Sequence, residues 1–347
     1  MKKQTYIFDG SISALSPLTV VIKGASTMAG HRLPRNGGMD APAYWPATTI
    51  RGAIRHMAHR AVVEAVKEAN GGSIPLDLAD HFLLAQGVDI ENATVSPGAG
   101  DINALEQLGL DPLLSLFGYW GVPSKACIGN AFPPAGSTGM FGGGARTIMF
   151  ERNTELLELL DQEQKDRLEN ILVEQSEASV DIQELKNKKK ELTKKAKNAT
   201  KEEKEELYKQ MNAIDEAIVS RKDEKTEAKE SIRRPIDQYE AIAAGTEMSH
   251  RMDIKGATQV ELGLFLAALA ELARDPFMGG HRNHDCGRIE ARWTVKTWPA
   301  GALAPIEVGS VEITPNGFIM TGDLLNSAYN AWLEARTNIR FGKPATE

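Results

Sequence analysis

The sequence predicts an α+β protein, a ferredoxin-like sandwich of sheet and helices interrupted by a long antiparallel helical hairpin. Two kinds of segment alternate along the chain. Thr246–Lys255 alternates apolar and polar residues, as half-buried strands do, whereas Gln259–Ala273 repeats its leucines at helical spacing. A third observation sets one region apart: no glycine or proline occurs between Glu151 and Arg234, although the chain holds 31 glycines and 16 prolines.

The N-terminal part of the chain begins with strand-like segments and continues with helices. Ile50, Ile54 and Met57 recur at helical spacing in the longest of these helices, so one of its faces is apolar. A later apolar element ends in a turn at Gly118. The expected elements are strands at 6–14 and 18–23, helices at 49–69, 76–85 and 101–108, and the apolar element at 111–119.

The C-terminal part completes the predicted sandwich. Its clearest element is the helix at 259–273, which Thr258 is expected to cap. Two long helices can cover one face of a mainly antiparallel sheet, and a ferredoxin-like core is the simplest such arrangement. The other expected elements are strands at 126–132 and 145–151 around a glycine-rich loop at 136–144, strands at 246–255 and 288–298, and a final helix at 324–337.

The segment without glycine or proline is predicted to form the hairpin. About half of its residues are charged, a composition that favours long helices. Thr200 followed by Glu203 matches a capping box, so a second helix is expected to start there and to end near Ser231. The hairpin would be an insertion at 151–234, and residues 1–150 and 235–347 would form the main domain. The seam residues with heptad-like spacing are Leu168, Leu172, Gln175, Ser179, Ile182, Leu207, Met211, Ile214 and Ile218.

Composition restricts the class of protein. The chain has 347 residues and a formal net charge of −7, which argues against a protein that coats DNA without sequence preference. Only Cys127 and Cys286 are present, so neither a disulfide framework nor a cysteine zinc site is predicted. No apolar run is long enough to span a membrane, and the first residues lack a signal-peptide core. We therefore expect a cytoplasmic protein without membrane contact.

The stretch from His31 to Arg60 is the most informative part of the sequence. Pro46 precedes two threonines, Thr48 and Thr49, whose hydroxyls are suited to capping the following helix. Arg51 and Arg55 stand one turn apart with Gly52 between them. A helix start with a small residue and two arginines is suited to a phosphate group. A plain amphipathic helix with solvated arginines explains the same pattern equally well.

Basic residues also gather beside other loops. They include Arg32 and Arg35, Arg233 and Arg234, and the loop from Gly279 to Arg282. Glycine amides can form a concave site for an anion, although a tight turn before a strand would use the same glycines. The lysine-rich part of the hairpin, Lys186–Lys197, is more simply explained as a solvated helix surface.

Three blocks of the sequence resemble the RAMP superfamily of CRISPR-associated proteins, in particular the backbone subunits that line guide RNA. The first resembles the superfamily's signature of two glycines, an aspartate and a helix start. The second is similar to its Leu-Phe-Gly turn, and the third to its closing glycine-rich loop. Within the superfamily the chain is most similar to the Csf backbone subunits of type IV effector complexes. The blocks are GGMDAPAYWPATTIRGAIR (37–55), LFGYWG (116–121), and YEAIAAGTEMSHRMDI (239–254) with FMGGHRNHDCGRIEARW (277–293).

The resemblance implies an RNA-recognition-like palm with finger and thumb insertions. It also implies a function: binding guide RNA (crRNA) by its backbone and presenting it for pairing with a target nucleic acid. Copies of the chain would then pack head to tail into a helical homo-oligomer, together with other effector subunits. No cofactor is implied, and the subunit is expected to hold RNA rather than to cut it.

Individual residues take their implied roles from this resemblance. Gly52 would permit close approach of the RNA backbone. Met140 and Phe141 are candidates for wedging between bases, although they fit equally well as buried loop anchors. The expected RNA-binding residues are Arg32, Arg35, Thr48, Thr49, Arg51, Gly52, Arg55, Arg146, Arg233, Arg234, Gly279, Gly280, His281 and Arg282.

Three alternatives remain open at this level. Asp40 matches the aspartate that supports metal-dependent RNA cleavage in type III relatives, although it equally fits a residue that braces its loop. A guide-processing RNase of the same superfamily would need a histidine as general base. Finally, the hairpin itself would be the functional part of an interaction scaffold. The histidines available to an RNase are His31, His56, His59, His281 and His284.

Overall fold

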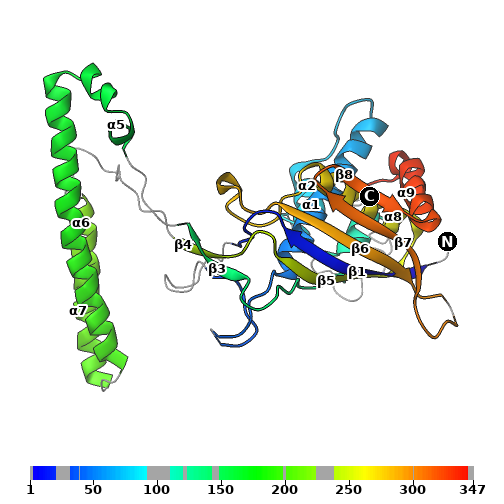
Figure 1. The fold of residues 1–347 in the computed structure, drawn as a ribbon, viewed down its shortest axis with the longest axis horizontal. Coiled ribbons are helices and arrows are strands. Elements are labelled where there is room, and N and C mark those ends of the chain that lie inside the picture. The colour runs from blue at the N-terminus through cyan, green and yellow to red at the C-terminus, as the bar shows by residue number, and fades with distance from the viewer. Residues whose placement is uncertain are drawn as a thin grey trace. The chain divides into compact units, whose positions relative to one another are not determined.

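The computed structural model describes residues 3–20, 32–38, 40–91, 110–119, 123–142, 148–197, 201–223, 238–299 and 301–342. The chain divides into two compact units, which we describe separately. The first comprises Met1–Phe141 and Gln238–Glu347, and the second comprises Gly142–Asp237. The first unit is an α+β domain, and the second is mainly a helical hairpin (Figure 1).

A six-stranded antiparallel sheet forms the centre of the first unit. Its strand order is β2-β5-β1-β6-β7-β8. Phe8 of β1 lies opposite Met252 of β5 on one side and Val295 of β6 on the other, which fixes the register of the three central strands. The strands are β1 (Gln4–Ala14), β2 (Ala126–Ile128), β5 (Glu247–Ala257), β6 (Ile289–Thr297), β7 (Ile306–Thr314) and β8 (Gly317–Thr321). A separate two-stranded sheet pairs β3 (Thr138–Gly142) with β4 (Gln238–Ile242).

Helices cover one face of the large sheet (Figure 1). They bury its apolar side chains, and Phe8 packs against Phe265 with ring centroids 5.3 Å apart. The opposite face carries polar residues such as Asp9, which pairs with Lys296 at 3.3 Å. One apolar face and one polar face are the arrangement expected of an antiparallel sheet. The helices are α1 (Ala47–Ala69), α2 (Leu78–Gln86), α4 (Pro112–Phe117), α8 (Gln259–Arg274), α9 (Asp323–Ala335), η2 (Arg282–His284) and η3 (Arg336–Asn338).

The start of α8 confirms the predicted cap. Thr258 Oγ1 accepts a hydrogen bond from the Glu261 amide, and the Glu261 carboxylate accepts one from the Thr258 amide, so both form a capping box. Glu261 is buried and pairs with Lys125 at 2.5 Å, and it also accepts a hydrogen bond from Ser115. One carboxylate therefore joins the start of α8 to α4 and to the residues before β2.

The second unit contains two long antiparallel helices that lie side by side (Figure 1). They are α6 (Gln162–Lys197) and α7 (Lys201–Asp223), preceded by α5 (Met149–Arg152) and η1 (Thr154–Leu159). Thr193 Oγ1 lies 3.5 Å from Met211 Sδ, and Lys189 pairs with Asp215 at 2.5 Å, which fixes the register of the two helices. Throughout the described ranges, no helix combines the length and the apolar character that crossing a bilayer requires.

Several expected elements differ in the structure. Residues 138–142, expected within a loop, form β3, and residues 149–152, expected at the end of a strand, form α5. The strands β7 and β8 were not predicted. The expected helix at 101–108 and the hairpin turn at 198–200 lie outside the described residues, as do the second half of the expected strand at 18–23 and the start of the expected strand at 145–151.

A buried histidine links three strands of the large sheet. His250 Nδ1 accepts a hydrogen bond from Trp293 Nε1 at 3.1 Å, so His250 Nε2 carries the proton and donates to the Gly129 carbonyl at 3.2 Å. Burial lowers the pKa of His250 to about 4, although the bond to Gly129 opposes this effect. The imidazole is therefore neutral in the folded protein near pH 7.

This histidine predicts a loss of stability in mild acid. An unfolded histidine titrates near pH 6.5, so the unfolded state binds more protons than the folded state between about pH 6.5 and pH 4. We expect the free energy of unfolding to fall by about 2 kcal/mol from about pH 7.5 to pH 5 through His250 alone. Urea titrations at the two pH values measure this difference. His250→Asn should reduce it, and an undiminished difference in that variant would contradict the assignment.

Candidate functional site

A cavity of about 660 Å³ opens beside the first turns of α1. Helix α1 contributes Thr48, Arg51, Gly52, Arg55 and His56 to its wall. The ends of α2 and α4 supply the rest of the wall, together with Pro123 and Ser124. No described residue of this lining is acidic. The structure thus brings together four of the residues expected from the sequence, in surroundings suited to an anion.

The beginning of α1 corrects one expectation. Pro46, not a threonine, is the N-cap residue, and it provides no side-chain hydrogen bond. The Ala47 amide donates instead to Asn130 Oδ1 at 2.8 Å. Thr48 and Thr49 therefore lie in the first turn, where Thr48 is exposed, and their predicted role as caps was wrong.

Gly52 and Arg51 form the open part of the cavity wall. A Cβ atom added at Gly52 would meet no atom within 4 Å, so a ligand can approach the helix backbone there. Arg51 is half-buried and, among the described residues, donates one hydrogen bond, to the Phe117 carbonyl. Because a guanidinium has five donor hydrogens, Arg51 retains donors for a ligand in the cavity.

Arg55 forms the inner wall and is almost completely buried, with 6% of its surface exposed. Its Nε donates to the Leu84 carbonyl, its Nη2 to that of Leu83 and its Nη1 to that of Gly118, each at 2.8 Å. These acceptors lie at the C-terminal ends of α2 and α4, where a cation is favoured by the helix dipoles. The expected phosphate-binding role of Arg55 is therefore corrected: the side chain joins three helices.

The charge of Arg55 persists despite its burial. Burial and the neighbouring charge of Arg51 lower the pKa of Arg55 to about 10, and Asp111 opposes them. A group with this pKa is protonated near pH 7, so the cavity retains a fixed positive charge behind its surface. Gly87 is required beside it, because an added Cβ would lie 2.8 Å from the guanidinium and the residue has φ +73°.

The glycine loop at 279–282 serves packing in this structure. A Cβ at Gly279 would lie 2.5 Å from the Thr19 carbonyl and 2.6 Å from the Trp45 ring, so only glycine fits. The Gly280 amide donates to the same Thr19 carbonyl at 2.8 Å. The Gly280 amide is therefore not available for the expected anion site. The loop instead holds the chain segment that leads into α1.

The two residues that follow are engaged as well. His281 stacks on Tyr239 with ring centroids 4.2 Å apart, and Arg282 pairs with Asp275 at 2.6 Å. Arg282 also lies over the Phe277 ring, at 4.5 Å. The charge of Arg282 is thus balanced by an internal ion pair, although the side chain remains exposed.

Arg32 and Arg35, the first basic cluster of the sequence, have different surroundings in the structure. Arg35 donates to both carboxylate oxygens of Glu240, which also accepts a hydrogen bond from the Leu33 amide at 3.0 Å. Burial raises the pKa of Glu240, but the bonds from Arg35 and Leu33 outweigh burial and the net shift is downward. Arg35 is therefore neutralised by an internal ion pair, whereas Arg32 is exposed.

The remaining expected residues are distributed over separate places. Asp40 is exposed in a turn that the Ala41 amide closes on the Gly38 carbonyl at 3.0 Å. Within the described ranges, no group of three or more His, Cys, Asp or Glu residues is arranged to hold a metal ion. Phe141 packs against the small buried cluster around Tyr239 and is a loop anchor, whereas Met140 is exposed. Arg146, Arg233 and Arg234 lie outside the described residues.

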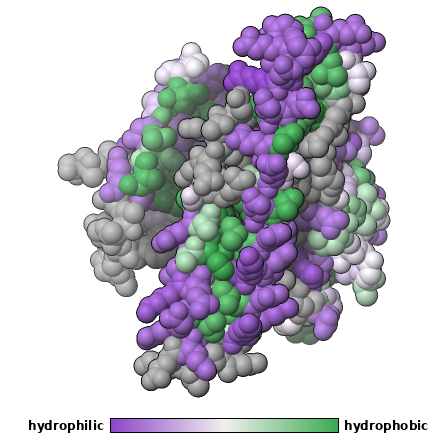
Figure 2. Space-filling model, turned by 90° about the vertical axis from the view of Figure 1, so that its left-hand side faces the viewer, coloured by the Kyte–Doolittle hydropathy of each residue, from purple (hydrophilic) through white to green (hydrophobic). Residues whose placement is uncertain are grey.

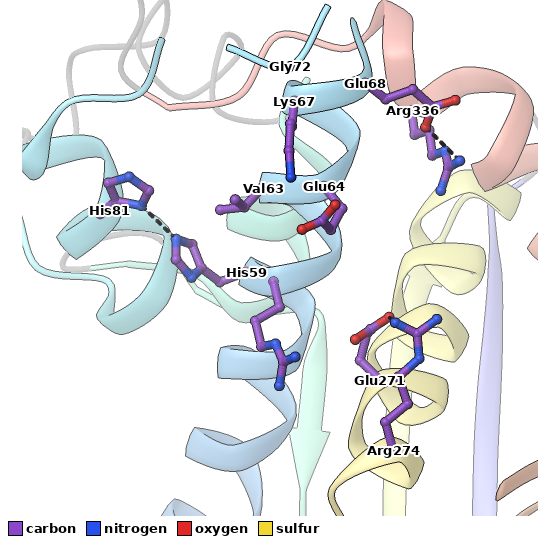
Figure 3. A pocket seen from close by; sticks show the side chains of 11 residues that line it. His59, Val63, Glu64, Lys67, Glu68, Gly72, His81, Glu271, Arg274 and Arg336 are labelled. Atoms are coloured by element: carbon purple, nitrogen blue, oxygen red, sulfur yellow. Dashed lines mark hydrogen bonds and ion pairs between the residues drawn. The ribbon is translucent and has the colours of Figure 1, made fainter. Parts of the chain in front are cut away.

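A second cavity, of about 710 Å³, lies between α1, α2, α8 and η3 (Figure 3). On one side His59 Nε2 and His81 Nδ1 are 3.0 Å apart and share a hydrogen bond. Charged side chains surround the pair; of these, Arg336 pairs with Glu68 at 2.6 Å and Arg274 with Glu271 at 2.7 Å. This cavity therefore differs from the first in its mixed charge. The remaining charged residues of its lining are Arg60, Glu64 and Lys67.

One histidine of the pair, His59, is held in a neutral form. Burial, together with the neighbouring His81, His56 and Arg55, lowers the pKa of His59 to about 4. His81 was not among the histidines considered from the sequence. Its position follows from the capping box of Asp77 and Asp80, which starts α2 and turns His81 toward α1.

Comparison with known proteins does not assign a family to this chain. Neither the scan against protein-family models nor the search of curated proteins finds a match. The function proposed below therefore depends on the residues and on the geometry described above.

The two arginines of α1 should respond differently to substitution. Arg55→Met removes the donors of buried carbonyls at the ends of two helices, and we expect it to lower the free energy of unfolding by about 3 kcal/mol. Arg51→Met removes a half-exposed donor and should cost less than about 1 kcal/mol. Urea denaturation measures both values. Equal losses in the two variants would show that Arg55 does not join the helices as described.

Proposed function

We propose that this protein is a guide-RNA-binding backbone subunit of a CRISPR effector complex, of the type IV class. The cavity beside α1 carries the proposal. It combines the N-terminal end of a helix, an open glycine, one arginine with free donors and one buried arginine, and its described lining contains no carboxylate. Such a wall suits a phosphodiester group, as expected of a subunit that holds the backbone of any guide.

The topology is compatible with this proposal. Strands β2, β5, β1 and β6 are neighbours in that order, and α1 and α8 connect β1 to β2 and β5 to β6. This is the strand order of a ferredoxin-like, RNA-recognition-like palm. In this interpretation β7 and β8 extend the palm, the β3–β4 sheet belongs to a thumb, and the helical hairpin is an insertion in that thumb.

The mechanism follows from the arrangement of the wall. A phosphate entering beside Gly52 meets the positive end of the α1 dipole and the free donors of Arg51. Arg55 strengthens the local potential from behind without contacting the RNA. The exposed Thr48 hydroxyl offers a further donor. Copies bound side by side along one guide would form a head-to-tail helical assembly with other effector subunits, in which the guide bases remain free to pair with a target.

Gly52 provides the sharpest test of this cavity. Gly52→Glu places a negative charge where the phosphate is expected, while the open space around the residue lets the fold tolerate the side chain. We expect at least about tenfold weaker binding of single-stranded RNA, which corresponds to about 1.4 kcal/mol. Fluorescence anisotropy with a labelled RNA measures the affinity.

Gly52→Ala is the matched control for this experiment. It adds no charge, so it should bind RNA more tightly than Gly52→Glu, and it should be more stable than the natural protein by about 1 kcal/mol, because alanine favours a helix over glycine. Unchanged RNA affinity in Gly52→Glu would exclude the cavity beside α1 as the RNA site.

The second cavity favours a second candidate function, a metal-independent RNase that processes guides. The neutral His59 can accept a proton from a ribose 2′-hydroxyl, which then attacks the adjacent phosphorus, and a protonated group can donate to the departing 5′-oxygen. Arg60 and Lys67 line the cavity and would hold the phosphate in this candidate function. The products would be a 2′,3′-cyclic phosphate and a free 5′-hydroxyl.

This candidate function predicts cleavage of repeat RNA by the purified protein in EDTA. His81→Ala should abolish the cleavage, because His81 is the hydrogen-bond partner of His59. His284→Ala, at an exposed histidine outside the cavity, should leave the cleavage unchanged. Gel analysis of labelled repeat RNA distinguishes these outcomes, and intact RNA with the natural protein would eliminate the candidate function.

A further inference from the structure

Strand β8 forms one edge of the large sheet. It stands last in the strand order and pairs with β7 alone among the described strands (Figure 1). Throughout the described part of the chain, no backbone group outside β7 is hydrogen bonded to the backbone of β8. An edge of this kind presents unpaired N–H and C=O groups, to which a strand of another chain can add.

The hairpin between β7 and β8 determines which backbone groups of this edge point outward. Thr314 and Gly317 close a two-residue turn, and the pairs beyond them alternate between non-hydrogen-bonded and hydrogen-bonded. Ile319, two pairs further along, is therefore hydrogen bonded to β7, and its amide and carbonyl point into the sheet. The amides and carbonyls of Phe318 and Met320 consequently point away from the sheet.

The edge lacks the features by which proteins usually protect an edge strand. Charged residues, prolines and bulges normally prevent such strands from pairing with other chains. From Ile313 to Leu333, a stretch that includes β8 and most of α9, Asp323 is the only charged residue, although 25% of the chain is charged. The ladder between β7 and β8 shows no register shift, and Pro315 lies in the turn rather than in the strand.

Ile319 is an exposed apolar residue at the middle of this edge. Its side chain is 50% exposed and lies beside Glu312 on the polar face of the sheet. The helical hairpin shows a different pattern, in which a narrow hydrophobic strip runs between rows of hydrophilic side chains (Figure 2). Strand β8 has no charged residue of its own to keep Ile319 in water, so a contact with another strand is favoured.

We propose that β8 is an interface for β8 of a second copy of this chain, which adds antiparallel to the edge about a two-fold axis at Ile319. In this register each Phe318 lies opposite Met320 of the other copy, so the outward amides and carbonyls of both residues pair with one another. The two Ile319 residues form the central, non-hydrogen-bonded pair. Side chains approach most closely in pairs of that kind, so the two isoleucines cover each other.

The edge complements itself better than it complements other partners. A nucleic acid is disfavoured because the stretch from Ile313 to Leu333 contains no basic residue. The opposite edge of the sheet, β2, has three residues, whereas two β8 strands can pair along five. Two β8 strands also form a closed, two-fold contact. This inference goes beyond the proposed RNA function and does not rest on it, because the β8 contact needs no guide.

The first experiment places charges at the centre of the contact, in the full-length chain freed of nucleic acid with nuclease. We expect the natural protein to form a dimer in analytical ultracentrifugation. Ile319→Lys and Ile319→Glu each place like charges directly opposite one another and should each weaken dimerisation at least about tenfold. An equimolar mixture of the two variants should restore a dimer, because lysine then lies opposite glutamate.

Ile306→Lys is the matched control. Ile306 is 52% exposed and lies in β7 beyond the end of β8, so the same substitution there should leave dimerisation unchanged. Circular dichroism checks that each variant keeps its secondary structure.

A disulfide tests the register directly. The Cα atoms of a non-hydrogen-bonded pair are about 4.5 Å apart, within the range that a disulfide spans. Cys127→Ser removes the exposed natural thiol, and Cys286 is buried. In the Cys127→Ser protein, Ile319→Cys should form a cross-linked dimer on mild oxidation, whereas Ile306→Cys should remain monomeric on a non-reducing gel.

Every other outcome would overturn the inference. A natural protein that stays monomeric, an Ile319→Lys variant that dimerises as before, a mixture that fails to recover or an absent cross-link would each exclude the β8 contact. Loss of the dimer in Ile306→Lys would assign association to another part of the sheet, and association only with added RNA would assign it to RNA. RNA affinity is measured separately through Gly52→Glu, so loss of dimerisation with intact RNA binding leaves the proposed function standing.

Discussion

The burial of one guanidinium group organises the candidate site. Arg55 projects from α1 into the point where α2 and α4 end, and it donates hydrogen bonds to the carbonyls of Leu83, Leu84 and Gly118, of which Leu83 also accepts from the Gly87 amide. Without this donor, the Leu84 and Gly118 carbonyls would lose the partner that Arg55 provides, at a cost of about 1–3 kcal/mol each. The cavity beside α1 is therefore bounded by helix ends that a cation holds in place. Arg55 therefore contributes to both the shape and the positive charge of this cavity.

This constraint explains why residues of the same type behave differently. Arg51 and Arg55 are one turn apart, but only Arg55 points into the junction of the helices, so only Arg51 keeps donors for a ligand. Arg35 and Arg282 are balanced by Glu240 and Asp275. A basic residue keeps donors for a ligand only when carboxylates and carbonyls of the protein do not already accept all of its hydrogen bonds. The positions of those acceptors in the fold therefore determine which arginines can bind.

Local patterns in the sequence predicted local structure well, and contacts between distant segments poorly. The capping box of Thr258 and Glu261 needs only three residues, and helix α8 starts where it predicts. The β7–β8 hairpin was missed although Asn316-Gly317, a strong turn signal, separates its strands. No local pattern reveals that Arg55 meets carbonyls about 30 and 60 residues away. The candidate cavity was thus predicted as a set of residues, but the division of roles within it required the fold.

The net charge of −7 is compatible with a cavity that attracts anions, because charge acts over short distances in salt solution. At physiological ionic strength the field of an exposed charge decays over about 8 Å. The acidic residues in the first half of α6 belong to the helical unit, whereas no acid occurs in the described lining of the cavity beside α1. The overall charge therefore governs solubility and nonspecific contacts, and the potential at the cavity depends on Arg51, Arg55 and the α1 dipole.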